Sequence, residues 1–373
     1  MKLARRISLS ILLLQIAVVA AGQSKTSSIQ TPAKNSLEAP MTIIDFKADD
    51  SLPMVPAEIG AWDYPMKCGS GDRYFINLLL PPEFLITQLS SISETKGIVR
   101  YSIKSARDLH NVTEKYYFPV ESGVVFLVTA TQSNRKGKYT IRKPDGSEEE
   151  RATYAGEYHD YLAKFDADGI YRGIVEIDKA LTVTSIGMFD SGTYLALGMT
   201  TSDRTNHLAL LDSDGTLLRL IDPPRALEKI AEDEAKVVPG IGQFGLTPWA
   251  QFLNFRRKIL VIPHSRGTVL EVSPGGEVRV ITLKIPVGLA IDSFLPSAEH
   301  WYARIGQRIQ MGVEQDLKKT RLYEFDPESG SILRQLKSEN ANVSDIACEQ
   351  GGEFVAFHWD ERGQLKAMRG TIH

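Results

Sequence analysis

A repeat of short apolar runs, separated by turns rich in aspartate and glycine, constrains the fold of this chain more than any other feature. The clearest unit covers residues 183–221 and contains four such runs. Asp190-Ser-Gly192 separates the first two runs, and Asp212-Ser-Asp-Gly215 separates the last two. Short apolar runs bounded by Asp-Gly turns at this spacing are typical of antiparallel β-hairpins. The unit is therefore predicted to be a four-stranded antiparallel sheet.

Parts of this unit recur along the chain. Its second half is repeated at residues 161–177, 268–281 and 321–336, and its first half at residues 66–77 and 343–357. Alignment of these copies gives six units, which start near residues 59, 116, 182, 244, 288 and 343. Four-stranded units repeated around an axis make a β-propeller, which leaves only short, protected sheet edges. We therefore predict an all-β fold, a six-bladed β-propeller, with a seven-bladed ring and an irregular β-sandwich as the competing architectures.

The last unit is one strand short. It ends after three apolar runs, at residues 364–372, whereas a spare apolar run at residues 41–46 precedes the first unit. We expect this N-terminal strand to complete the last blade and so to close the ring.

The hairpins of the form apolar-Asp-x-x-Gly-x-apolar resemble those of six-bladed β-propellers of the NHL and related bacterial periplasmic types. The resemblance covers residues 41–373. It implies the fold only, because the shared pattern encodes turns rather than chemistry, and propellers serve as enzymes, sensors and scaffolds.

The N-terminus predicts export. Lys2, Arg5 and Arg6 precede an apolar run over residues 7–20, and small residues follow up to Gly22. This order is that of a secretory signal peptide; a retained N-terminal anchor is the alternative. We expect a signal peptide over residues 1–22, cleaved near Gly22, then a flexible polar leader over residues 23–40, and the propeller over residues 41–373. The protein should be periplasmic or extracellular.

The charge of the chain gives no sign of a nucleic-acid partner. The formal net charge is −3, and removal of the signal peptide takes away three positive charges and leaves −6. Nucleic-acid-binding domains usually carry a basic excess or patch. No later run reaches membrane-span length. We expect a monomer without a transmembrane span after signal removal, and a protein or small molecule as its partner.

Long insertions indicate where a partner would bind. They occupy residues 81–96, 130–158 and 306–320, and a helix is expected over residues 222–238. In a propeller these segments belong to one face, and long excursions on a rigid scaffold usually carry binding. The alternative is that they only cap the ring. The candidate binding residues, all predicted in or beside loops of this insertion-rich face, are Arg204, His207, His264, Arg266, His358 and Trp359.

No catalytic or metal-binding motif is present, so we assign no catalytic residue, no metal ligand and no cofactor. The Asp-x-Asp-Gly sequences at residues 166–169 and 212–215 lack the later ligands of a calcium loop and are interpreted as hairpin turns. The three histidines near one axis suggest a metal site, although histidines are also ordinary at strand ends. The predicted function is that of an exported binding or scaffold module. The alternative is a metal-dependent hydrolase or lactonase of the gluconolactonase type, whose Glu, Asn and Asp ligands cannot be assigned here.

The only two cysteines occupy matching positions in the repeat. Cys68 and Cys348 both align with Met188 of the third unit, and they belong to the first and last units, which are neighbours in a closed ring. An oxidising compartment permits a disulfide. Cys68 and Cys348 are therefore a candidate disulfide; two buried, reduced cysteines are the alternative.

Overall fold

A computed structural model describes residues 39–373 with gaps at residues 54–59, 62–66, 70–72, 80–86, 107, 133–134, 144, 203–205, 223, 225–249, 263–266, 286–288, 296, 298, 308–319, 362–363 and 373. The described residues form an all-β fold with two short 3-10 turns, η1 (Ile103–Ser105) and η3 (Val343–Asp345), and contain no α-helix. The predicted signal peptide, nearly all of the predicted leader and most of the expected helix lie outside the described residues.

Four sheets of four or five strands follow one another along the chain, and all their pairings are antiparallel. The first sheet contains β2 (Gly60–Ala61), β3 (Lys67–Cys68), β4 (Tyr74–Leu79), β5 (Thr87–Ser93) and β6 (Gly97–Tyr101). The second contains β7 (His110–Val120), β8 (Gly123–Thr131), β11 (His159–Asp166) and β12 (Tyr171–Glu176). The third contains β13 (Leu181–Met188), β14 (Tyr194–Thr200), β15 (Asn206–Leu211) and β16 (Leu217–Ile221). The fourth contains β17 (Gln251–Phe255), β18 (Lys258–Ile262), β19 (Thr268–Val272) and β20 (Val278–Thr282).

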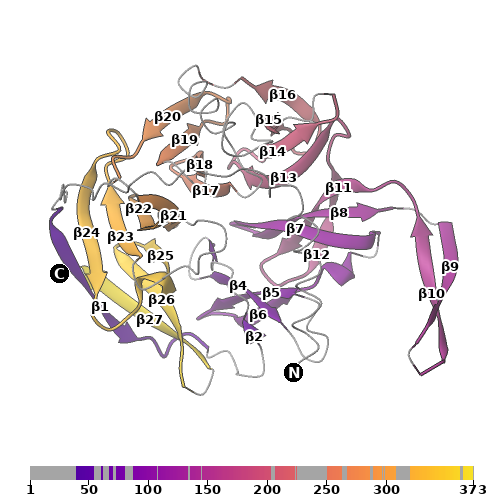
Figure 1. The fold of residues 1–373 in the computed structure, drawn as a ribbon, viewed down its shortest axis with the longest axis horizontal. Helices are drawn as coiled ribbons and strands as arrows, with labels where there is room; N and C mark the ends of the chain where they lie inside the picture. The colour runs from indigo at the N-terminus through magenta and orange to yellow at the C-terminus, as the bar shows by residue number, and fades with distance from the viewer. Residues whose placement is uncertain are drawn as a thin grey trace, which may run out of the picture. The chain divides into compact units, whose positions relative to one another are not determined.

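The rest of the chain forms one eight-stranded sheet and one separate hairpin. The large sheet has the order β21-β22-β23-β24-β1-β27-β26-β25. Its strands are β21 (Leu289–Leu295), β22 (Trp301–Gln307), β23 (Arg321–Phe325), β24 (Ile332–Ser338), β25 (Ile346–Gln350), β26 (Glu353–Trp359), β27 (Leu365–Ile372) and β1 (Met41–Ala48). The hairpin consists of β9 (Arg135–Arg142) and β10 (Glu148–Ala155). The sheets are arranged like the blades of a β-propeller (Figure 1), which confirms the predicted all-β, propeller-like fold.

Two details of the sequence prediction are wrong. Residues 81–96, expected to be a loop insertion, include strand β5. Trp359, expected in a loop, is the last residue of β26 and pairs with Leu365 of β27. Both errors have the same origin, since Thr, Gln and Ser in β5 and His and Trp in β26 break the apolar pattern while the backbone pairing continues.

Apolar side chains between neighbouring sheets hold the fold together. The middle strands are buried on both faces: all six residues of β15 are buried, whereas only Ile221 is buried in the outer strand β16. This gradient explains why the middle strands are continuous apolar runs in the sequence. One apolar cluster contains Tyr74 of the first sheet together with Phe357 of β26, so the last strands pack against the first.

The Asp-x-Asp-Gly sequences are hairpin turns, as predicted. In the turn between β15 and β16, the Asp212 carboxylate accepts hydrogen bonds from the backbone N–H groups of Asp214 and Thr216, each at 2.9 Å. Gly215 closes the turn with a φ of 80°. A Cβ atom on Gly215 would lie 2.3 Å from the carbonyl oxygen of Glu176, in the outer strand of the preceding sheet. The turn therefore also serves as a contact between sheets.

The N-terminal strand β1 closes the last group of strands, as expected. Residues Ile44 to Ala48 pair antiparallel with β27, and residues Met41 to Ile44 pair in parallel with β24. Ile44 and Phe46 are almost fully buried, with exposed fractions of 1% and 2%. Strand β1 therefore bridges the β21–β24 and β25–β27 parts of the large sheet.

Replacement of Gly215 by Ala should destabilise the protein more than replacement of Gly192, its matched control. Gly192 has a similar φ of 85° but nothing within 4 Å of its Cβ position. The left-handed backbone alone should cost about 1–2 kcal/mol in both variants. Overlap with Glu176 should add about 1–3 kcal/mol for Gly215→Ala. Urea unfolding measures both, and equal losses would show that the turn does not support the preceding sheet.

Candidate functional site

Each four-stranded sheet has two different ends. Because the strands alternate in direction, the first-to-second and third-to-fourth turns lie at one end, which we call the turn end. The second-to-third connection and the links to neighbouring sheets lie at the other, the connection end. The six candidate binding residues all belong to connection ends by their positions in the chain, either between or beside second and third strands. The connection end corresponds to the insertion-rich face expected from the sequence.

The structure describes three of the six candidates. His207 is the second residue of β15 and is buried, with an exposed fraction of 7%. His358 lies near the end of β26, and its side chain is 60% exposed. Trp359 follows it as the last residue of that strand. Arg204, His264 and Arg266 lie outside the described residues.

His358 is paired with a carboxylate. Its Nδ1 lies 3.4 Å from Oδ2 of Asp345, which ends the turn η3 just before β25. A carboxylate in this position favours one orientation of the ring. The exposed side chain leaves the other ring nitrogen accessible to a ligand. The pair can therefore hydrogen-bond a polar partner at the connection end.

A buried arginine holds this turn in place. Arg304 of β22 donates hydrogen bonds to the carbonyl oxygens of Val343 (3.2 Å) and Ile346, and to Oγ of Ser293 (3.0 Å). Burial lowers the pKa of Arg304 to about 10, against the opposing influence of the Asp292 and Asp345 carboxylates. The guanidinium therefore stays charged at neutral pH, and it fixes the backbone on either side of Asp345.

Of the three histidines expected near one axis, the structure describes His207 and His358, which belong to different sheets. Within the described ranges, no three His, Cys, Asp or Glu side chains are grouped closely enough to hold a metal ion. The same residues include no helix with the length and hydropathy needed to cross a bilayer.

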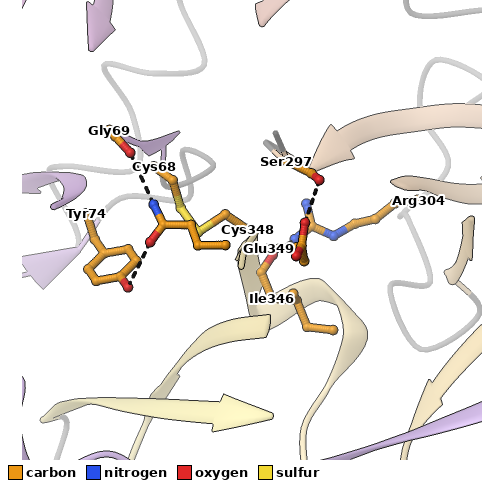
Figure 2. The surroundings of a disulfide bond; sticks show 9 residues. Cys68, Gly69, Tyr74, Ser297, Arg304, Ile346, Cys348 and Glu349 are labelled. Atoms are coloured by element: carbon orange, nitrogen blue, oxygen red, sulfur yellow. Dashed lines mark hydrogen bonds between the residues drawn. A yellow bond between two sulfur atoms is a disulfide. The ribbon is translucent and has the colours of Figure 1, made fainter. Parts of the chain in front are cut away.

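Cys68 and Cys348 form a disulfide in the structure. The bond joins β3 of the first sheet to β25, with the two Cα atoms 6.1 Å apart (Figure 2). Next to it, Nε2 of Gln350 donates a hydrogen bond to the carbonyl oxygen of Gly69 at 3.1 Å. On the other side of β25, the Ser297 hydroxyl donates to the Glu349 carboxylate, which ties the same strand to the β21–β24 part of the sheet (Figure 2).

Arg369 makes a second connection at the same seam. Its guanidinium contacts three carboxylates, those of Asp49 after β1, Glu94 between β5 and β6, and Glu353 at the start of β26. Burial alone would raise the pKa of the Asp49 carboxyl, but hydrogen bonds from Ser51 and Arg369 outweigh burial and hold the pKa below its ordinary value of 3.8. The clamp thus joins the end of β1, the last strands and the first sheet.

Sequence reasoning missed Asp345, Arg304 and Asp292. The signal available for two of them was a charged residue inside an otherwise apolar strand, as in Trp301-Tyr-Ala-Arg304-Ile and Ala290-Ile-Asp292. Such residues need a buried partner. For Arg304, two of these partners are carbonyl oxygens of Val343 and Ile346, at the start of the β25–β27 part of the same large sheet, and the sequence pattern does not identify them.

The comparisons with known proteins assign no family and no function. No protein-family model matches the chain, and no curated protein matches it. Among solved structures, a catalytically inactive virginiamycin B lyase from Staphylococcus aureus is 12% identical, with 87% of this chain and 99% of that chain covered and a TM-score of 0.39. A member of the DUF4221 family from Bacteroides vulgatus is 7% identical, with coverages of 88% and 98% and a TM-score of 0.43. Both TM-scores are below 0.5, so neither likeness carries an argument about this chain.

The disulfide should be detectable in the unfolded, unreduced protein as an absence of free thiols. Closing a loop across a sequence separation of 280 residues should stabilise the fold by about 5–6 kcal/mol in the chain-entropy treatment. The double variant Cys68→Ala with Cys348→Ala should therefore unfold at lower urea concentration by a corresponding amount. Two titratable thiols per chain would contradict the bond.

The Arg369 clamp should make stability depend on acid pH. Because the pKa of Asp49 is lower in the folded protein, the clamp contributes fully above the unfolded-state pKa of about 3.9. Its contribution is lost as the pH falls through the lower folded-state value. Between about pH 5 and pH 2, the wild type should lose more free energy of unfolding than Arg369→Met. Arg100→Met, at an exposed arginine of β6, is the control and should keep the wild-type slope; parallel curves for all three proteins would contradict the clamp.

Proposed function

We propose that the protein is an exported binding or scaffold module, a six-bladed propeller of the NHL-like type that holds its partner at the connection end. The blade count treats the eight-stranded sheet as two blades. Strands β21–β24 make the fifth, and β25–β27 with β1 make the sixth, because β1 pairs with β27 over a longer stretch than with β24. Export follows from the charged and apolar start of the chain, with cleavage near Gly22.

The β9–β10 hairpin, which we call the arm, is the observation that carries this proposal. It is inserted between β8 and β11, the second and third strands of the second sheet, and among the described strands it pairs with no other. Figure 1 shows it extending away from that sheet. An isolated two-stranded hairpin is marginally stable in water, so the arm adds little to the stability of the fold. A conspicuous excursion that the core does not need is best explained as a contact element.

The described surface of the arm is charged. Lys138 lies 2.7 Å from Glu150, and Lys143 lies 3.0 Å from Glu149. Exposed pairs of this kind contribute little to stability, but they keep free strand edges from aggregating. A surface of both charges suits a polar partner, which agrees with the exposed His358 side chain at a connection end.

The remaining candidates complete the proposed contact surface. Arg204, His264, Arg266 and Trp359 belong to the same connection ends in the chain order. His207 is assigned a supporting position rather than a contact, because it is buried.

A photo-crosslinking amino acid at Thr140 in the arm should capture a partner in the cells that naturally produce the protein. Thr140 is exposed, and p-benzoylphenylalanine in its place should give a discrete adduct. The matched control is the same substitution at Ser191, an exposed residue at a turn end, which should give none. The protein recovered should begin at Gly22 or Gln23. Adducts of equal yield at both positions, or only at Ser191, would contradict binding at the connection end, and an intact Met1 would contradict export.

A further inference from the structure

Strand β1 lies between the edges of β24 and β27, in a position that suits an extended strand. The Asn340 side chain makes two hydrogen bonds with the backbone of Phe46. Its Oδ1 accepts from the Phe46 N–H at 3.2 Å, and its Nδ2 donates to the Phe46 carbonyl oxygen. At the start of the strand, the Gln335 N–H donates to the carbonyl oxygen of Pro40 at 2.8 Å. Backbone contacts from β24, β27 and Asn340 hold a strand of this shape whichever chain supplies it.

The edge also has room for two apolar side chains. A Cβ atom on Gly370 of β27 would lie 2.7 Å from Ile44 and 2.8 Å from Phe46, so the glycine makes space for both. The two side chains join a cluster that includes Leu336, Tyr302 and Phe354. The acceptor therefore selects a strand with apolar residues at alternate positions, the pattern of Ile44-Asp-Phe46.

The disulfide closes the ring without β1. Cys68 and Cys348 join the first sheet to β25, and β25 lies at the far end of the group from β1 in the order β1-β27-β26-β25. The seam stays covalently joined when β1 leaves its place, so the acceptor edge persists as a preformed site.

The chain has the length needed to deliver β1 elsewhere. Residues 49–59 separate β1 from β2, and such a segment spans roughly 35–40 Å when extended. The outer surface of β1 and β24 is apolar at this position, since Met41, Ile43 and Leu333 have exposed fractions of 61%, 46% and 48%. Met41 lies opposite Gln335 in the β1–β24 pairing, two residues along the strand from Leu333. A second copy docked here would cover these side chains.

We propose that the edge between β24 and β27 is a strand-acceptor site that takes β1 from a second copy of this chain, so that two closed rings exchange their N-terminal strands. The occupant is the same sequence that fills the site within one chain. Exchange replaces each β1 contact by an identical one. In addition, we expect the second copy to bury part of the exposed apolar surface of Met41, Ile43 and Leu333. The inference is independent of where a partner binds at the connection end.

Two full-length single variants, Asp45→Cys and Thr371→Cys, test the exchange when mixed and oxidised. These exposed residues lie opposite each other in the β1–β27 pairing, at a Cα separation suited to a disulfide. We expect a bond between the two chains, identified by mass spectrometry of the joined peptides, that increases with protein concentration. Asp45→Cys mixed with Ser191→Cys, a distant exposed turn, measures random oxidation and should give several-fold less product.

The same two substitutions in one chain provide the reference. At low protein concentration this double variant should form the bond within the chain, and once oxidised it should no longer exchange when mixed with the single variants. If it oxidises fully while the mixed single variants give no more product than the Ser191 control, the exchange is refuted. Adding Cys68→Ala and Cys348→Ala to the mixed variants should replace the discrete two-chain product by aggregates, because strand release then opens the ring; an unchanged product would refute the role of the disulfide.

Discussion

Closure of the seam between the last strands and the first sheet is the constraint on which the other contacts depend. Every other pair of neighbouring sheets is joined by continuous chain, whereas this pair brings together segments from opposite ends of the sequence. Three contacts at different places hold it: β1 beside β27, the Cys68–Cys348 bond between β3 and β25, and the Arg369 clamp. They protect the apolar cluster that contains Tyr74 and Phe357. Without closure this cluster would be exposed to water, and the adjoining apolar clusters would lose packing contacts on one side.

At other junctions between neighbouring sheets, one polar side chain fixes the relative position of the two sheets, which apolar packing alone would not determine. Between the second and third sheets, Asp160 binds the Val183 N–H at 2.8 Å and the Lys115 ammonium at 2.7 Å. Between the fourth sheet and β21, the Gln251 amide exchanges two hydrogen bonds with the Phe294 backbone, at 3.0 and 2.9 Å. A buried polar group is stable only when its partners are in place, so each tie specifies one relative position of two sheets, which non-directional apolar contacts do not.

The turns, the apolar middle strands and the matching of the two cysteines could be predicted, because each depends on residues close in the sequence or on their place in the repeat. Asp212 and Gly215 define their turn locally, and the repeat alone aligned Cys68 with Cys348. The site residues could not be predicted in this way. Arg304 has its acceptors, at Val343 and Ile346, about 40 residues away in the next group of strands, and Asp345 meets His358 only after β25 and β26 have paired. Trp359 was misplaced because an aromatic residue at a strand end has no local signal that separates pairing from looping.

The turn ends are occupied by structural contacts, and this explains why binding is assigned to the connection ends. Two pairs of neighbouring first-to-second turns are joined by hydrogen bonds: Arg256 donates to the carbonyl oxygen of Glu299, and Gln350 donates to that of Gly69. The third-to-fourth turns press against the preceding sheet, where Gly169, Gly215 and Gly330 leave no space for a side chain. An insertion in either class of turn would separate neighbouring sheets. An insertion between the second and third strands does not push neighbouring sheets apart. The arm shows this, because β8 and β11 pair without a register shift from the Gly123/Asp166 pair to the Ala130/His159 pair. The fold can therefore change what it binds at the connection ends without changing how it closes.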